Sequence, residues 1–255
     1  MSLKEYKNSK ISIILPNYNS SEFISTTVKS ILNQSYKGWE LIIVDDYSNK
    51  DTRKKLLKYK NNKKIKIYWL KKNKGTAYCR NFAIKKSKFK FLAFIDSDDI
   101  WEKNKLKIQL HFMEKNKYDF TYTNYKTFDD GKYNFKKIKV LNRFSFSSFT
   151  KDTSIATSTM MVNKKIAKDT VFINTKICED YFYKCKILKK TKFAFCVEKY
   201  LTKYRIRKNS MQSYKFRNFY WIWKINKEYN KFNFFKNLTS LFFISLSSIK
   251  KYGFK

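Results

Sequence analysis

Short apolar runs alternate with amphipathic stretches along the first half of the chain. The apolar runs are rich in β-branched and aromatic side chains, which predicts strands at residues 11–15, 41–44, 65–70 and 91–95. The stretches between them predict three helices. The first starts at a capping-box-like pair, Asn19 and Glu22, and carries Ile24, Val28, Ile31 and Leu32 on one face; the second lies at about 51–60, and the third follows Gly75 and ends at about residue 86. Runs without polar alternation are typical of strands covered on both faces, and intervening helices make parallel connections. The pattern therefore predicts an α/β fold with an open, doubly wound, mostly parallel sheet.

The pattern changes after residue 117. Residues 118–125 alternate between apolar and polar side chains, as a strand with one solvated face does, and another strand is predicted at residues 154–162. Residues 126–150 are polar and irregular, which indicates a surface excursion or a hairpin. Glu179 and Asp180 open a predicted short helix, and the chain from residue 215 is aromatic, basic and predicted to be helical.

Polar residues follow three of the predicted strands at the point where each strand ends. Pro16, Asn17 and Tyr18 follow the first strand, Asp45 and Asp46 follow the second, and the cluster Asp96-Ser97-Asp98-Asp99 follows the fourth. Ligands of doubly wound sheets bind at the carboxyl ends of the strands. We therefore expect these three segments to meet at one edge of the sheet and to form one site.

The acidic cluster is the strongest candidate for a metal site. Two carboxylates one residue apart suit a hard divalent cation such as Mn²⁺ or Mg²⁺, which keeps one or two carboxylates and completes its shell with phosphates and water. The plainer alternative is a solvated turn in which Asp99 caps a helix. A buried strand that delivers three carboxylates to one place favours the cation, because unneutralised charges of one sign repel.

The net charge of +37 suggests a polyanionic partner. Only six of the 57 basic residues are arginine, the side chain best suited to phosphate and base recognition, so we expect no nucleic-acid partner. Two interpretations remain open: a solvated lysine surface, and attraction to an anionic membrane.

The chain is expected to work in the cytoplasm. Its four cysteines lack paired spacing, and the polar residues 1–7 are followed by no apolar segment typical of a signal peptide. The weakly polar stretch 238–249 would reach only about 18 Å as a helix, against a hydrocarbon core of about 30 Å. Such a helix would lie flat on a membrane. Two interpretations of residues 215–255 therefore stay open: peripheral attachment to the cytoplasmic face of the inner membrane, and helices that cover the flank of the catalytic domain. No obligate protein partner is inferred.

Ordered motifs resemble the family 2 glycosyltransferases of the GT-A fold, of the bacterial cell-surface glycan type. The resemblance is close over residues 11 to about 115 and looser over the later motifs. The motifs are Ile11–Asn19, Ser30–Tyr36, Glu40–Asp46, Asn73-Lys-Gly75, Arg80-Asn81, Phe94–Asp99 and, less closely, Glu179-Asp180 and Tyr204–Ser210. The resemblance implies a catalytic domain at 1–214, with a nucleotide-sugar-binding half at 11–115 and an acceptor half at 116–214. The remaining residues, 215–255, are expected to form a helical tail.

The resemblance also implies roles for individual residues. Tyr18 would stack on the nucleotide base, usually uracil, and Asp46 would accept a hydrogen bond from the base edge. Arg80 would lie near the base or the diphosphate, and Pro16 and Ser97 would belong to the substrate site. Asp98, with Asp96 or Asp99, would hold the metal on the diphosphate, and Asp180 would be the catalytic base. The plainer alternatives are simple packing for Tyr18, a turn for Asp46 and a surface ion pair with a carboxylate for Arg80.

These roles predict an inverting transfer of a sugar from a nucleotide-sugar donor, expected to be UDP-linked, to a hydroxyl of a glycan or lipid-linked acceptor. The Gln-x-x-Arg-Trp signature of processive synthases is absent, which favours single additions. Tyr47 and Ala83 stand where glycine is typical of the family, which suggests an altered donor pocket. The rival functions are a sugar nucleotidyltransferase, although its glycine-rich loop is missing after the first strand, and a non-catalytic basic RNA- or membrane-binding protein.

Overall fold

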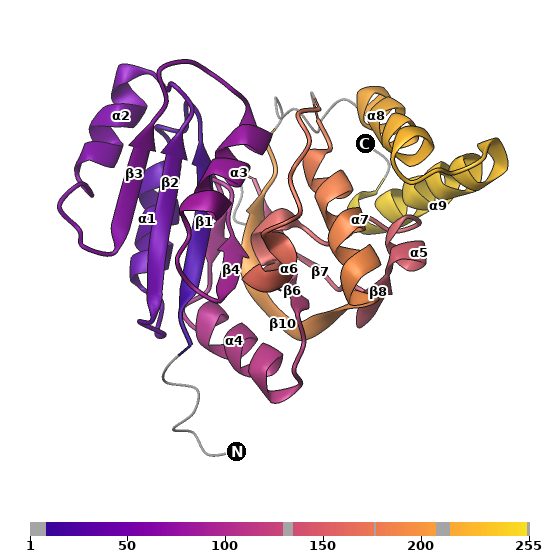
Figure 1. Ribbon diagram of the computed structural model, residues 1–255, viewed down its shortest axis with the longest axis horizontal. Coiled ribbons are helices and arrows are strands. Elements are labelled where there is room, and N and C mark those ends of the chain that lie inside the picture. Colours follow the sequence, from indigo (N-terminus) through magenta and orange to yellow (C-terminus); the bar gives the residue numbers. More distant parts are fainter. Residues whose placement is uncertain (1–8, 130–134, 176, 208–214, 254–255) are drawn as a thin grey trace.

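The computed structural model describes residues 9–129, 135–175, 177–207 and 215–253. A ten-stranded sheet forms the centre, with the order β3-β2-β1-β4-β9-β6-β10-β5, while β7 pairs with β6 and β8 with β10. Its longest pairings are parallel, and antiparallel strands are added in the second half (Figure 1). The α/β fold with a mostly parallel sheet is therefore confirmed.

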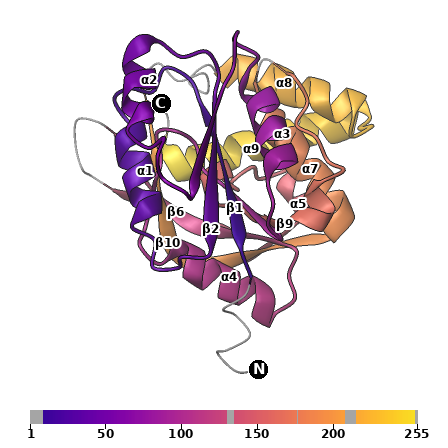
Figure 2. The same ribbon diagram turned by 60° about the vertical axis from the view of Figure 1, so that its left-hand side comes forward.

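The first half follows the predicted alternation of strands and helices. Its elements are β1 (Ile11–Asn17), α1 (Ile24–Leu32), β2 (Trp39–Asp45), α2 (Lys50–Leu57), β3 (Ile65–Trp69), α3 (Thr76–Lys86) and β4 (Phe91–Phe94). Every residue of β1, β2 and β4 is buried, as the unbroken apolar runs predicted. Figure 2 shows α1 and α3 on opposite sides of β1 and β2, which is why these strands are covered on both faces.

The predicted capping box before α1 is wrong. Helix α1 begins after Phe23, and no side chain caps it. Asn19 instead has a left-handed backbone (φ 45°), and its side-chain oxygen accepts from the backbone N–H of Asn49 (2.8 Å). The Asn19 side chain thus ties the loop after β1 to the start of α2.

The second half departs further from the prediction. Its elements are β5 (Ile100–Trp101), α4 (Lys105–Lys115), β6 (Phe120–Phe128), β7 (Lys136–Ile138), β8 (Arg143–Ser145), α5 (Phe146–Phe149), η2 (Thr157–Thr159), β9 (Met161–Asn163), α6 (Lys164–Ala167), α7 (Glu179–Thr191) and β10 (Phe193–Arg205). The antiparallel pairing of β7 with β6 agrees with the hairpin predicted within residues 126–150, but β8 and α5 in the same stretch were not predicted. Of the predicted strand 154–162, only residues 161–162 lie in the sheet, after a 3₁₀ turn.

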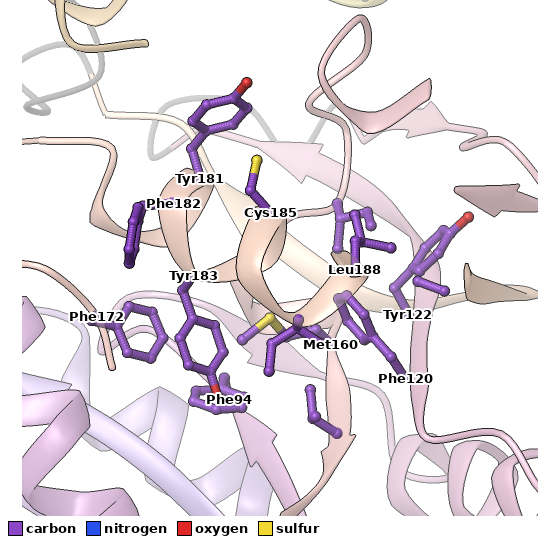
Figure 3. Packing of buried hydrophobic residues seen from close by; sticks show 14 of the residues in the cluster. Phe94, Phe120, Tyr122, Met160, Phe172, Tyr181, Phe182, Tyr183, Cys185 and Leu188 are labelled. Atoms are coloured by element: carbon purple, nitrogen blue, oxygen red, sulfur yellow. The ribbon is translucent and has the colours of Figure 1, made fainter. Parts of the chain in front are cut away.

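Helix α7 anchors one of the two cores (Figure 3). The ring of Tyr183 stacks on Phe172 with centroids 3.8 Å apart and packs against Phe94 of β4. The second core lies on the other face, where α1 and α4 cover the sheet. Because α7 is fixed to the end of β4 by buried aromatic rings, its first turn is held in a constant position relative to the acidic loop.

Helices α8 (Lys215–Glu228) and α9 (Phe234–Tyr252) form the C-terminal extension at the end of the molecule opposite α2 and β3 (Figure 1). The buried Asn226 side chain joins them to α7: its oxygen accepts from the Tyr181 hydroxyl (2.7 Å), and its amide donates to Asn237 and Ser240 of α9 (both 3.1 Å). Among the described residues, no helix has both the length and the apolar character needed to cross a bilayer.

Candidate active site

The ends of β1 and β2 are joined by a buried polar network. The two strands pair in register from Ile11 with Trp39 to Asn17 with Asp45. The Asn17 amide donates to Asp45 (2.8 Å), and the other oxygen of that carboxylate accepts from Arg53 Nε (3.1 Å). Asp45 therefore joins the ends of β1 and β2 and has a structural role. The residues that follow each strand are the candidates for contact with a ligand.

Asp46 organises the loop that leads into α3. Its two carboxylate oxygens accept from the backbone N–H groups of Lys74 (2.7 Å) and Gly75 (2.8 Å). Gly75 has φ +86°, a conformation that favours glycine, so the Asn-Lys-Gly motif is explained by this turn. The predicted contact of Asp46 with a nucleotide base remains a prediction, and its observed partners are backbone groups of the loop.

An exposed tyrosine ring follows each of the first two strands. Tyr18 follows β1 and is 53% exposed, and Tyr47 follows β2 and is 56% exposed. Tyr47 has φ +64°, which explains why glycine is typical at this position. Pro16, by contrast, is buried within β1 in register with Val44, so its contribution to a site is limited to the backbone.

Arg80 bridges the end of β4 and the start of α7. One guanidinium nitrogen lies 2.7 Å from Asp96 and the other 2.7 Å from Glu179, and the side chain is only 5% exposed. Burial alone would lower the pKa of Arg80, but the charges of Asp96 and Glu179 raise it, so the cation is permanent. The sequence indicated a donor contact for Arg80; in the structure its charged end is engaged by two carboxylates.

The acidic cluster divides into two parts. The Asp96 and Asp98 side chains are 30% and 19% exposed, whereas Asp99 is 1% exposed and accepts from the backbone N–H of Arg205 (2.9 Å). Burial raises the pKa of both Asp98 and Asp99, and neighbouring carboxylates of the cluster raise it further. Asp99 thus anchors β10 from inside. Ser97 contributes its carbonyl oxygen, which accepts from Thr27 Oγ1 (3.0 Å).

Two partly exposed carboxylates fit a divalent cation that completes its shell with substrate phosphates. Asp96 and Asp98 are the residues that could hold it. The structure offers no group of three or more His, Cys, Asp or Glu side chains around one point within the described ranges. These residues alone would therefore not complete the coordination shell of a metal. Asp99 does not fit the ligand set, because its side chain is buried.

Asp180 lies in the first turn of α7, as predicted, where the helix dipole favours a carboxylate. One of its oxygens accepts from Thr157 Oγ1 (2.9 Å) and from Lys184 Nζ (2.6 Å). Burial would raise the pKa of Asp180, but Lys184 and Arg80 hold it well below its usual range. Since a quarter of the Asp180 side chain is exposed, the site contains an ionised carboxylate that a substrate can reach.

Sequence reasoning missed several partners in this site. Glu179, Lys184, Thr157 and Arg207 each contact a predicted site residue. Two of them carried a readable signal: Glu179 precedes Asp180 in the same motif, and Lys184 stands four residues after Asp180 on the predicted helix. Thr157 and Arg207 are distant in sequence, and residues 208–210 of the motif that contains Arg207 lie outside the described ranges.

A sheet of this topology, with an acidic loop at the end of β4 and a carboxylate at the start of α7, is typical of GT-A glycosyltransferases. The fold is similar to that of the S. aureus TarS 1-349 structure in complex with UDP-GlcNAc, with a TM-score of 0.72, 21% identity, and coverage of 94% of this chain and 73% of that chain. The model of the family described as "Glycosyl transferase family 2" matches residues 12–182. The chain therefore belongs to this family and is a glycosyltransferase, which decides against the nucleotidyltransferase and non-catalytic alternatives.

Two curated relatives align over most of their length. One is the "Putative teichuronic acid biosynthesis glycosyltransferase TuaG" of Bacillus subtilis, 32% identical over 94% of this chain and 96% of its own. The other is the "UDP-Glc:alpha-D-GlcNAc-diphosphoundecaprenol beta-1,3-glucosyltransferase WfgD" of Escherichia coli, 32% identical over 84% of each chain. Both are bacterial glycosyltransferases.

Proposed function

We propose that this protein is an inverting, metal-dependent, non-processive glycosyltransferase. It moves a sugar from a UDP-linked donor to a hydroxyl of a glycan or lipid-linked acceptor in the synthesis of a cell-surface polysaccharide. The names of two relatives support the substrate classes: WfgD is named for a UDP-sugar donor and a diphosphoundecaprenol acceptor, and TuaG for teichuronic acid biosynthesis.

One observation carries the proposal, namely the Arg80 bridge between Asp96 and Glu179. A single guanidinium contacts both carboxylates at 2.7 Å. The acidic loop after β4 and Asp180, which follows Glu179, therefore lie near each other, which supports assigning them to one site. Leaving-group binding and proton removal need their carboxylates held close together around the reacting atoms.

The donor half of the site would use the loops after β1, β2 and β4. The exposed rings of Tyr18 and Tyr47 offer stacking surfaces for a base. Asp46 would accept a hydrogen bond from the edge of the base, and Pro16 and Ser97 would contribute backbone atoms to the pocket. A bound Mn²⁺ or Mg²⁺ supplies Lewis-acid stabilisation of the charge that grows on the departing diphosphate. Asp96 and Asp98 would hold that cation.

The acceptor half would use Asp180 as the general base. Its carboxylate is ionised, and Thr157 and Lys184 fix its orientation through one oxygen. The acceptor hydroxyl gives its proton to Asp180 as its oxygen attacks the anomeric carbon, and the bond to the diphosphate breaks on the opposite face. Attack from that side inverts the anomeric configuration.

Nucleotide binding tests the donor assignment. UDP should bind more tightly in the presence of Mn²⁺, and Asp98→Asn should remove this metal dependence. Asp169→Asn, a change at an exposed carboxylate after α6, is the matched control and should leave it intact. A screen of nucleotide sugars for hydrolysis with Mn²⁺ then identifies the donor. If the wild-type protein bound UDP with the same affinity with and without Mn²⁺, the proposed metal dependence would be contradicted.

The α8–α9 extension supports peripheral attachment to an anionic membrane. Exposed apolar side chains recur along α9 at helical spacing: Phe235 (77%), Leu238 (52%), Phe242 (58%) and Leu246 (48%). Helix α9 also carries Lys236, Lys250 and Lys251, and the chain as a whole is strongly basic. An amphipathic helix of this kind lies in the membrane interface and binds anionic lipids.

Flotation with liposomes tests the attachment. Binding is expected to vesicles containing phosphatidylglycerol and to weaken as salt rises. The double change Leu238→Ser with Phe242→Ser should reduce it strongly. Leu57→Ser is the matched control, because Leu57 on α2 is also 52% exposed but lies at the other end of the molecule. Absence of binding by the wild type at low salt contradicts the proposal.

A further inference from the structure

Arg207 forms an ion pair with Asp98, the aspartate to which the proposed function assigns the metal. Arg207 Nε lies 3.1 Å from Asp98 Oδ2. The two residues come from different elements, since Asp98 follows β4 and Arg207 stands two residues beyond the end of β10. The Asp98 and Arg207 side chains are 19% and 42% exposed, so a ligand in solution can reach the pair and displace it.

Contacts other than the ion pair also hold Arg207 beside the acidic loop. Its guanidinium carbon lies 5.4 Å from the centre of the Phe23 ring, and that of Arg205 lies 4.5 Å from the same ring. Arg205 Nε donates to the carbonyl oxygen of Asp98 (2.9 Å). The position of Arg207 is therefore supported even when Asp98 takes another partner.

A divalent cation requires the carboxylate that Arg207 occupies. Two cationic groups with a total charge of +3 on one carboxylate repel each other, so each weakens the binding of the other. A nucleotide diphosphate changes this balance because it brings negative charge that both cations can share. Arginine is well suited to that role, since its planar guanidinium matches phosphate oxygens.

We propose that Arg207 neutralises Asp98 in the nucleotide-free enzyme and moves to the donor diphosphate when a divalent cation binds Asp98. This inference rests on the proposed function, in which Asp98 holds the metal. Arg207 and the cation then compete in the absence of nucleotide and cooperate in the presence of a diphosphate. Because such coupling is reciprocal, it can be measured from either ligand.

Calorimetric titration of the full chain tests this with three probes: Mn²⁺ alone, UDP with Mn²⁺, and UMP with Mn²⁺. In Arg207→Ala, Mn²⁺ alone should bind about two- to fivefold more tightly, the change expected when an exposed ion pair is removed. UDP with Mn²⁺ should bind about tenfold more weakly, the size of a lost charge-assisted hydrogen bond. UMP, which lacks the second phosphate, should change by less than about twofold.

Two further variants at arginine positions serve as references. Arg207→Lys keeps the charge and should give intermediate values for Mn²⁺ and UDP. Arg143→Ala is the matched control: Arg143 is exposed and stacks over Phe193 (5.0 Å), but it lies on β8, which pairs with the opposite end of β10. It should leave all three affinities unchanged.

Two outcomes overturn the inference while leaving the proposed function intact. In the first, Arg207→Ala behaves like Arg143→Ala with all three probes. In the second, it binds Mn²⁺ alone more weakly. The metal assignment itself is tested separately by Asp98→Asn: if Mn²⁺ still promotes UDP binding to that variant, Asp98 is not the ligand, and the competition loses its basis as well.

Discussion

At the scale of single residues, the carboxylate of Asp180 illustrates how neighbours decide the state of a group. Burial disfavours its charge, yet Lys184 at 2.6 Å and the nearby Arg80 keep the pKa of Asp180 well below its usual range. Lys184 is itself only 3% exposed, so the two side chains form a largely desolvated pair. A base with such a low pKa is ionised at every physiological pH, and orientation by Thr157 and Lys184 is what directs it at the acceptor.

The first prediction concerns Lys184→Met, which keeps the length of the side chain but removes the charge. The pKa of Asp180 should rise, so the acidic limb of the pH–rate profile should move to higher pH. A carboxylate whose pKa is lower in the folded than in the unfolded state stabilises the fold. This stabilisation is fully present above the unfolded-state pKa of about 3.9 and is lost as pH falls through the folded-state pKa. The free energy of unfolding should therefore fall more at pH 7 than at pH 3.

Lys186→Met on the same helix is the control, because Lys186 lies over the Phe182 ring and has no contact with Asp180. An unchanged acidic limb in Lys184→Met would show that Lys184 does not set the ionisation of the base.

The second prediction separates Asp99 from its neighbours in the acidic cluster. Asp99→Asn keeps an oxygen that can accept from the backbone N–H of Arg205, so both stability and Mn²⁺-dependent UDP binding should be retained. Asp99→Ala removes this part-buried hydrogen bond and should cost about 1–3 kcal/mol, measured by urea unfolding. If Asp99→Asn lost Mn²⁺-dependent UDP binding while the fold stayed intact, Asp99 would have to be a metal ligand after all.

At the scale of elements, the sequence predicted strands best where burial is complete. The continuous apolar runs of β1, β2 and β4 could be recognised without any tertiary information. β10 could not, although it is thirteen residues long: it carries Glu198, Lys199 and Lys203 and shifts register twice against β6. Its pairing depends on β6, β5 and β8, which are remote in sequence. The order of the site loops was therefore predictable, whereas the contacts made by the end of β10 were not.

The third prediction concerns the junction of α7, α8 and α9. Asn226→Leu removes the partner of the Tyr181 hydroxyl and of groups on α9 in a buried network. Leaving such groups unsatisfied should cost about 1–3 kcal/mol or more. Activity should also fall, because Tyr181 follows the base directly. Asn116→Ala, at the exposed end of α4, is the control for urea unfolding. Equal stability of the two variants would contradict this account of the junction.

At the scale of the whole molecule, the C-terminal extension and the catalytic sheet share one hydrophobic core. Ile222, Ile225 and Ile244 of α8 and α9 are buried in the cluster that contains α7 and the inner strands. The sequence predicted an aromatic, basic helical tail from residue 215, and α8 begins at that position. The shared core argues that the extension is nevertheless part of the folding unit.

The fourth prediction follows from this shared core. The full chain should unfold in one transition, with fluorescence and far-ultraviolet circular dichroism coinciding. A chain shortened to residues 1–214 exposes the apolar surface that the two helices cover, and it should aggregate or unfold at much lower denaturant concentrations. Two separate transitions, or a stable shortened chain, would show that the extension is an independent appendage.

The central claim is that metal-assisted donor binding and proton removal belong to different carboxylates of one site. Asp180→Asn tests it most directly, with UDP affinity in Mn²⁺ and the rate of sugar transfer measured on the same preparation. Transfer should fall by about 10²–10⁴, as expected for loss of a general base, while UDP affinity stays within about twofold of the wild type. Full transfer activity, or a loss of UDP binding as large as the loss of rate, would contradict the account.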